Sequence, residues 1–188
     1  MKKGLLRIRR PEGLRLSRRE AIYVTVYTVA IAAASVLAHE AAHIVAALAL
    51  GVSFNELRLG FLGINPSVTL PEWFIGTPLT ITYYAGGLTA AVGLFAFYLL
   101  YWVRKCHRNP SLFHWSLGAV TIALAAMQLA TGYLEGRYHG AYVVGAMSLF
   151  SPTDLLIYGW AASAIFFHSA LCPWRRIKVH VKSGINTA

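Results

Sequence analysis

Long apolar runs separated by short polar segments dominate the sequence. About 17 to 25 mainly apolar residues in a helix cross the hydrocarbon core of a bilayer. Four runs are long enough, at residues 21–50, 79–103, 112–134 and 155–171. The chain is 57% hydrophobic and only 13% charged, unlike a typical soluble domain. The pattern therefore predicts an all-α polytopic membrane protein with about four transmembrane helices.

Two local signals predict the limits of the first helix. Ser17 followed by Glu20 has the form of a capping box, in which each of the two side chains accepts a hydrogen bond from the backbone N–H of the other residue. Gly51 follows the last apolar residue of the run and is a common stop signal. We expect the first helix to begin near Ser17 and to end near Leu50.

The segment after the first run, residues 52–77, has a different pattern. Val52 to Leu59 alternates apolar and polar residues, which is typical of a half-buried strand. Gly60, Gly63 and Asn65-Pro66 then mark a turn, and Ser67 to Leu70 has the composition of a returning strand. We predict a small β-hairpin over residues 52–77, directly after the first span.

Basic residues gather in three clusters and give the chain a net charge of +10. Eight of the 17 Lys and Arg residues precede Glu20, three lie within residues 104–108, and four lie from Arg175 onward. Such clusters favour the cytoplasmic side of a membrane. We therefore predict a basic cytoplasmic or interfacial segment (residues 1–20), a membrane domain (21–172) and a basic cytoplasmic tail (173–188), with both termini cytoplasmic. This distribution explains the charge without a nucleic-acid partner.

The first apolar run contains the pentapeptide His39-Glu40-Ala41-Ala42-His43. Its two histidines and its glutamate are the only His, Asp, Glu, Lys or Arg residues between positions 21 and 50, and polar groups at bilayer depth usually have a function. Residues four apart share one face of a helix. This HExxH spacing lets His39 and His43 bind one Zn²⁺ while Glu40 acts as the catalytic base for a water molecule.

The HExxH helix, the hairpin expected after it and the sequence YYAGGLTAAVG at residues 83–93 together resemble the site-two-type intramembrane zinc metalloproteases. In that family the HExxH helix supplies two zinc ligands, and a small-residue motif, commonly Ala-Gly-Pro, packs near the site. Ala85-Gly86-Gly87 matches that motif here. A downstream Asp, often in an Asp-Gly pair, completes the zinc shell in the family. The chain has no Asp-Gly pair.

The third metal ligand is therefore open at the level of sequence. Catalytic zinc sites use three protein ligands and a water molecule. His139 is the first candidate, since it lies in a polar segment where related proteases place their Asp, and Asp154 and Glu135 are the alternatives. Glu135 would share a helix face with His139 if the helix continued, but Gly136 argues against continuation. A site without any third ligand is the remaining possibility.

The chemistry and the resemblance together predict an intramembrane zinc metalloprotease. Its substrate would be another membrane protein, cleaved at a peptide bond in a membrane-embedded or membrane-adjacent segment. The alternative is a protease-like membrane subunit with an incomplete metal site, kept as a structural or assembly partner in a membrane complex. A transporter would need polar residues in several spans, whereas the later spans carry little beyond Gln128.

Overall fold

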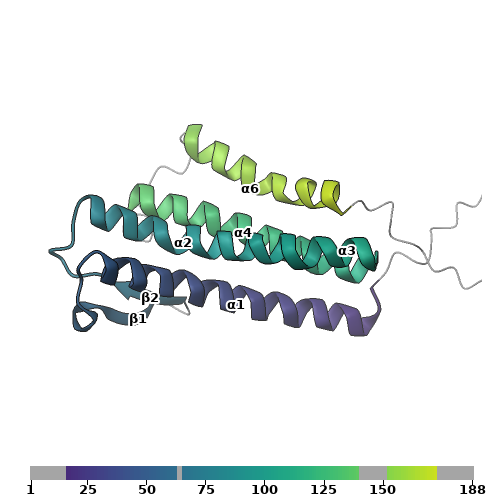
Figure 1. The fold of residues 1–188 in the computed structure, drawn as a ribbon, viewed down its shortest axis with the longest axis horizontal. Coiled ribbons are helices and arrows are strands. Elements are labelled where there is room, and N and C mark those ends of the chain that lie inside the picture. The colour runs from purple at the N-terminus through teal and green to yellow at the C-terminus, as the bar shows by residue number, and fades with distance from the viewer. Residues whose placement is uncertain (1–15, 63–64, 140–151, 173–188) are drawn as a thin grey trace, which may run out of the picture.

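The computed structural model describes residues 16–62, 65–139 and 152–172, which form a bundle of long helices with one small hairpin (Figure 1). The predicted basic tail at 173–188 and most of the predicted basic segment at 1–20 lie outside the described residues. The mainly helical architecture and the small antiparallel sheet agree with the prediction. The cytoplasmic placement of the two termini stays a prediction.

Helix α1 (Arg18–Ala49) begins at the capping box that the sequence predicts. The Ser17 hydroxyl oxygen accepts from the Glu20 backbone N–H at 3.2 Å, and Glu20 Oε2 accepts from the Ser17 backbone N–H at 2.8 Å. These bonds satisfy two backbone donors that a helix start otherwise leaves without partners. The helix ends before Gly51, whose φ of 99° lies in the left-handed region that favours glycine.

The hairpin pairs β1 (Arg58–Leu62) with β2 (Asn65–Thr69) in antiparallel register, with Arg58 opposite Thr69. A hairpin here is confirmed, but the prediction of a strand over Val52 to Leu59 is wrong. Phe54–Glu56 forms a 3-10 turn, η1, because Glu56 Oε2 accepts from the Ser53 backbone N–H at 2.9 Å. This local capping bond takes residues from the expected strand, which starts only at Arg58.

The second long helix is continuous from Thr77 to Arg108, in three parts: α2 (Thr77–Phe97), the π-helical η2 (Tyr98–Val103) and α3 (Arg104–Arg108). It thus continues beyond residue 103, where the second predicted span ends, and includes the basic cluster at residues 104–108. Helix α4 (Leu112–Tyr138) and helix α6 (Pro152–Leu171) follow. Helix α1, the Thr77–Arg108 helix and α4 are each long and apolar enough to cross a membrane. The apolar part of α6 is shorter, and a fourth span stays a prediction.

Helices α1, α2 and α4 run side by side, with α6 on the far side of α4 from α1 and the hairpin beside one end of α1 (Figure 1). A large apolar cluster lies in the half of the bundle away from the hairpin and includes Tyr98, Trp102 and Ile122. Helices α2 and α4 approach closely where Gly87 faces Gly132, since a Cβ on Gly87 would lie 2.3 Å from the Gly132 Cα. Small residues permit this backbone contact, and it brings α4 close to α1 and α2.

Candidate metal centre

Two histidines of α1 and one glutamate of α4 converge inside the bundle. One ligand atom from each of His39, His43 and Glu135 lies within 4.8 Å of the others. Glu135 Oε2 lies 2.8 Å from His39 Nε2 and 3.5 Å from His43 Nε2. Both histidines are buried, and the Glu135 side chain is 18% exposed. The helical spacing of the HExxH sequence thus places both imidazoles on the side of α1 that faces the other helices.

Gly86 of α2 provides the space that the two imidazole rings occupy. A Cβ added to Gly86 would lie 2.4 Å from His43 Nε2 and 2.8 Å from His39 Cδ2, closer than van der Waals contact allows. Of the three small residues that the resemblance places near the site, Gly86 contacts the rings and Gly87 contacts α4. Ala85 is partly exposed. The α2 backbone therefore forms one wall of the site.

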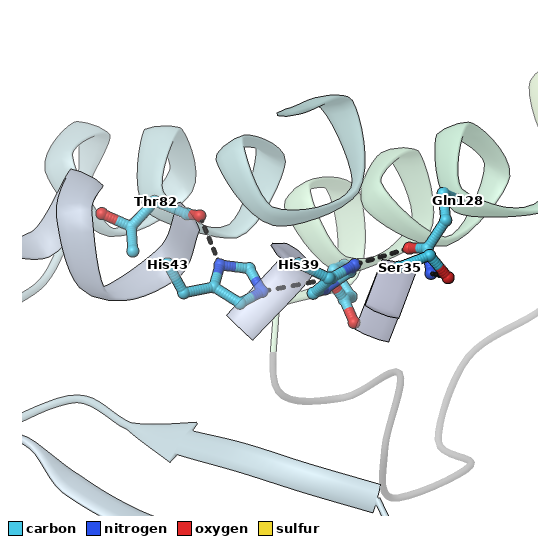
Figure 2. Close-up of polar contacts among 6 residues, drawn as sticks. Ser35, His39, His43, Thr82 and Gln128 are labelled. Atoms are coloured by element: carbon cyan, nitrogen blue, oxygen red, sulfur yellow. Dashed lines mark hydrogen bonds and ion pairs between the residues drawn. The ribbon is translucent and has the colours of Figure 1, made fainter. Parts of the chain in front are cut away.

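A chain of buried hydrogen bonds fixes the His39 ring through Nδ1, the ring nitrogen that does not face Glu135 (Figure 2). The Ser35 hydroxyl donates to the Ala32 carbonyl at 2.8 Å, and the Gln128 amide nitrogen donates to the Ser35 oxygen at 3.1 Å. Gln128 Oε1 then lies 2.8 Å from His39 Nδ1. An amide oxygen can only accept, so His39 Nδ1 carries the proton of this bond.

His43 is held in the same way by the main chain of α2. Its Nδ1 lies 2.7 Å from the Thr82 carbonyl oxygen (Figure 2), and a carbonyl oxygen can only accept. In a neutral imidazole the other ring nitrogen is then a bare acceptor. Both histidines accordingly direct Nε2 lone pairs toward Glu135.

This arrangement brings three acceptors together without a donor of their own. Two Nε2 lone pairs and a carboxylate repel one another unless a positive charge lies among them. A proton would supply that charge, and so would a metal ion. Two histidines and one glutamate form one of the ligand sets of catalytic zinc, and a hydrogen bond from the second ring nitrogen is the usual support of a metal-binding histidine. The donor set therefore fits zinc.

Glu40, the predicted base, lies next to this group on α1. Its side chain is half-buried and interacts electrostatically with His39, His43 and Glu135. Its carboxylate accepts a hydrogen bond from the Val68 backbone in β2. The hairpin thus borders the site on the side of α1 where the candidate base lies.

The first candidate for the third ligand, His139, lies apart from the converging atoms. It follows the last residue of α4 with a φ of 49°, its Nε2 lies 2.8 Å from the Thr80 hydroxyl oxygen, and its ring stacks on Tyr83 at 5.5 Å between centroids. The side chain of Asp154 lies outside the described residues. The structure therefore brings Glu135, and not His139, together with the two HExxH histidines.

The expectation that Gly136 would end the helix is wrong. Helix α4 continues to Tyr138, and Gly136 is buried against the ring of Tyr84, where a Cβ would lie 2.4 Å from Cγ. Helix packing requires a glycine at this position, and that requirement outweighs its low helix propensity. One signal in the sequence does mark Glu135. Together with Gly136 it forms an acid–glycine pair with glutamate in place of the family's aspartate.

Gln128 and Ser35 were not assigned to the site from sequence. Gln128 is the single amide in the apolar run at 112–134, and Ser35 lies two turns before His43 on the same face of α1. These positions are signals of a polar contact between α1 and α4, although neither signal identifies its partner.

Comparisons of this chain with protein-family models, with curated proteins and with solved structures found no match.

Proposed function

We propose that this protein is a zinc metalloprotease that hydrolyses peptide bonds in membrane-embedded or membrane-adjacent segments of other proteins. The observation that carries the proposal is the convergence of His39 Nε2, His43 Nε2 and the Glu135 carboxylate within 4.8 Å. The Nδ1 atoms of the two histidines are hydrogen-bonded to Gln128 and to the Thr82 carbonyl. The Nε2 lone pairs are therefore left for a cation. Glu40 lies beside this group on the same helix.

Zinc at this position would be held by His39, His43 and Glu135. When bound, it supplies a Lewis acid that lowers the pKa of water to about 7 and polarises a peptide carbonyl. Glu40 has the role of general base and acid: its carboxylate takes a proton from water and returns it to the amine of the leaving peptide. The half-buried position of Glu40, beside the buried histidines, suits a group that must meet both water and substrate.

The surroundings of the site point to the substrate class. The candidate ligands come from α1 and α4, which are two of the three helices among the described residues that are long and apolar enough to cross a membrane. A substrate segment that reaches them must itself lie in or next to the membrane. The hairpin and the segments that flank it also carry exposed apolar side chains, at Phe54, Leu59, Phe61, Trp73 and Ile75.

One contact favours the alternative of a structural subunit. His39 Nε2 and Glu135 Oε2 are 2.8 Å apart, a distance at which a protonated histidine and a carboxylate form a hydrogen-bonded ion pair without a metal. In that case the three side chains join α1 to α4 and have no catalytic role. The two functions differ in whether the purified protein takes up zinc.

Zinc content and peptide cleavage, measured on the full chain in detergent, separate these functions. We expect about one zinc ion per chain, a loss of zinc in Glu135→Ala, and full zinc content in Glu40→Gln. A library of transmembrane peptides, with products identified by mass spectrometry, should be cleaved by the unsubstituted protein and not by Glu40→Gln. A protein that takes up no zinc, or equal cleavage by Glu40→Gln, would contradict the protease.

A further inference from the structure

We infer that Gln128 and Ser35 are positioning residues that fix the tautomer of His39 and so keep its Nε2 lone pair directed at the site. The effect on metal affinity rests on the proposed function. The effect on the tautomer does not, because it follows from the hydrogen bonds alone. Neither residue reaches the converging ligand atoms, so both act only through His39.

The burial of this chain of hydrogen bonds makes its pattern energetically important. Ser35 and Gln128 are 4% and 5% exposed, and both belong to helices that are long and apolar enough to cross a membrane. A buried polar group without a partner is costly, whereas a fully bonded chain specifies one arrangement. In the observed order, the Ser35 hydroxyl, both polar atoms of the Gln128 amide and His39 Nδ1 each have a hydrogen-bond partner.

Of the two described partners that bond a histidine Nδ1 in the site, the Gln128 amide has two different ends, whereas the Thr82 carbonyl has one. Turned as observed, its oxygen faces His39 Nδ1 and its nitrogen faces Ser35. Turned by 180°, it would present N–H to His39, and the imidazole proton would move to Nε2, where it blocks metal binding. The side chain that faces the amide from α1 therefore decides which tautomer His39 adopts.

Ser35 selects the observed orientation because its own proton is already used. Its hydroxyl donates to the Ala32 carbonyl one turn earlier in α1, which leaves an oxygen lone pair to face Gln128. That lone pair attracts the amide N–H and repels the amide oxygen. A serine in α1 thus directs an amide in α4, which in turn directs a histidine in α1.

His43 needs no such selection, and this difference provides an internal reference. Its Nδ1 partner is the Thr82 main-chain carbonyl, which has only one role and cannot be turned. Substitutions of Ser35 or Gln128 should therefore change the protonation of His39 and leave that of His43 unchanged.

The first test is nitrogen-15 NMR of histidine-labelled, metal-free full-length protein in nanodiscs. The expected result is a proton on Nδ1 of both His39 and His43. In Gln128→Met, which removes both ends of the amide, the Nδ1 proton signal of His39 should be lost or exchange-broadened and that of His43 retained. A bare His39 Nδ1 in the unsubstituted protein, or an unchanged His39 signal in Gln128→Met, would overturn the inference.

The second test measures zinc affinity by competition with a chromophoric chelator. Loss of a partner that supports a metal-binding histidine typically lowers metal affinity about 10- to 100-fold, and we expect this loss in Gln128→Met and a smaller one in Ser35→Ala. Gln128→Glu presents an acceptor at both ends, so it should keep the affinity. In that background Ser35 no longer selects an orientation, so Ser35→Ala should not reproduce the loss that it causes in the unsubstituted protein, and an equal loss in both backgrounds would overturn the inference.

A matched control separates positioning from packing. Thr121 is another buried polar residue of α4, and its hydroxyl bonds Tyr27 of α1 at 2.7 Å, away from the site. Thr121→Val should leave both the His39 signal and zinc affinity unchanged. A protein that binds no zinc at all would contradict the proposed function, while the NMR result would still decide the role of Gln128.

Discussion

Two buried histidines of this bundle, His39 and His168, differ in how their ring nitrogens are satisfied. His168, on α6, has its Nε2 3.0 Å from the Trp115 carbonyl oxygen and its Nδ1 2.8 Å from the Tyr98 hydroxyl. The carbonyl accepts and the hydroxyl donates, so both ring nitrogens of a neutral His168 have a suitable hydrogen-bond partner. His39 has an acceptor at Nδ1 and a second acceptor, Glu135, at Nε2.

The difference shows which feature sets the candidate metal site apart from a buried histidine that is satisfied without a metal. Both histidine regions lie against a glycine: a Cβ on Gly118 would lie 2.8 Å from His168 Cε1, much as one on Gly86 would lie close to His39 and His43. Burial and glycine contact are therefore common to both regions. Only the balance of donors and acceptors separates a histidine that holds helices together from one that needs a cation.

The largest effect is expected when one histidine is removed from each region. His39→Ala should lose nearly all bound zinc, because two ligands rarely retain the ion against a chelator, whereas His168→Ala should keep the full amount. Metal analysis after gel filtration measures both. Equal zinc loss in the two variants would mean that the donor count does not distinguish them.

The glycine contact of the candidate metal site can be tested by adding a methyl group at Gly86. Gly86→Ala places a methyl group against His43 Nε2, so we expect at least a tenfold loss of zinc affinity together with a destabilisation of about 1–3 kcal/mol from overpacking. Gly93→Ala is the matched control on the same helix, since a Cβ there meets nothing within 4 Å. Chelator competition and thermal unfolding report the two effects, and similar results for both variants would count against the site.

A smaller effect is expected where the histidine is already satisfied. Tyr98→Phe removes the donor to His168 Nδ1 and leaves a buried acceptor without a partner, which costs about 1–3 kcal/mol. Thermal unfolding in detergent should show this loss of stability, with zinc content unchanged. A fall in zinc content would show that the two regions are coupled.

The smallest effect concerns a carboxylate that meets donors, in contrast to Glu135. The pKa of Glu56 lies below its ordinary value because the Ser53 backbone N–H and then the Trp73 indole N–H, each at 2.9 Å, donate to the carboxylate. A lowered folded-state pKa contributes stability that is complete above the unfolded value and is lost as pH falls through the folded value. Trp73→Phe should raise the Glu56 pKa toward its ordinary value, as an NMR titration would measure, and an unmoved pKa would exclude the indole bond.

The parts of this fold that depend on neighbouring residues in sequence could be predicted. The capping box at Ser17, the shared face of His39 and His43 and the presence of a hairpin all follow from short spacings. The sequence predicts Glu135 only as an alternative ligand, because Gly136 lowers helix propensity by about 1 kcal/mol. The packing that offsets this cost comes from Tyr84, about 50 residues away in the sequence.

The contact between Gln128 and His39 could not be predicted from the sequence either, for a different reason. Gln128 is visible in the sequence as a polar residue among apolar ones, but its position opposite His39 depends on how α1 and α4 are aligned. That alignment is fixed in part by the Gly87–Gly132 contact between α2 and α4. Local patterns contain no information on the axial offset of two helices that are far apart in the chain.

The main-chain bond from Thr82 to His43 has a consequence for mutational scanning. A scan that replaces each residue in turn can detect Gln128, because its side chain carries the bond to His39. The same scan cannot remove the bond to His43, since every residue at position 82 still has a carbonyl. A map of sensitive positions would therefore underestimate the contribution of α2 to the candidate metal site. Replacing the main-chain amide between residues 82 and 83 by an ester makes the Thr82 carbonyl a weaker acceptor. This replacement would reveal how much the bond to His43 contributes.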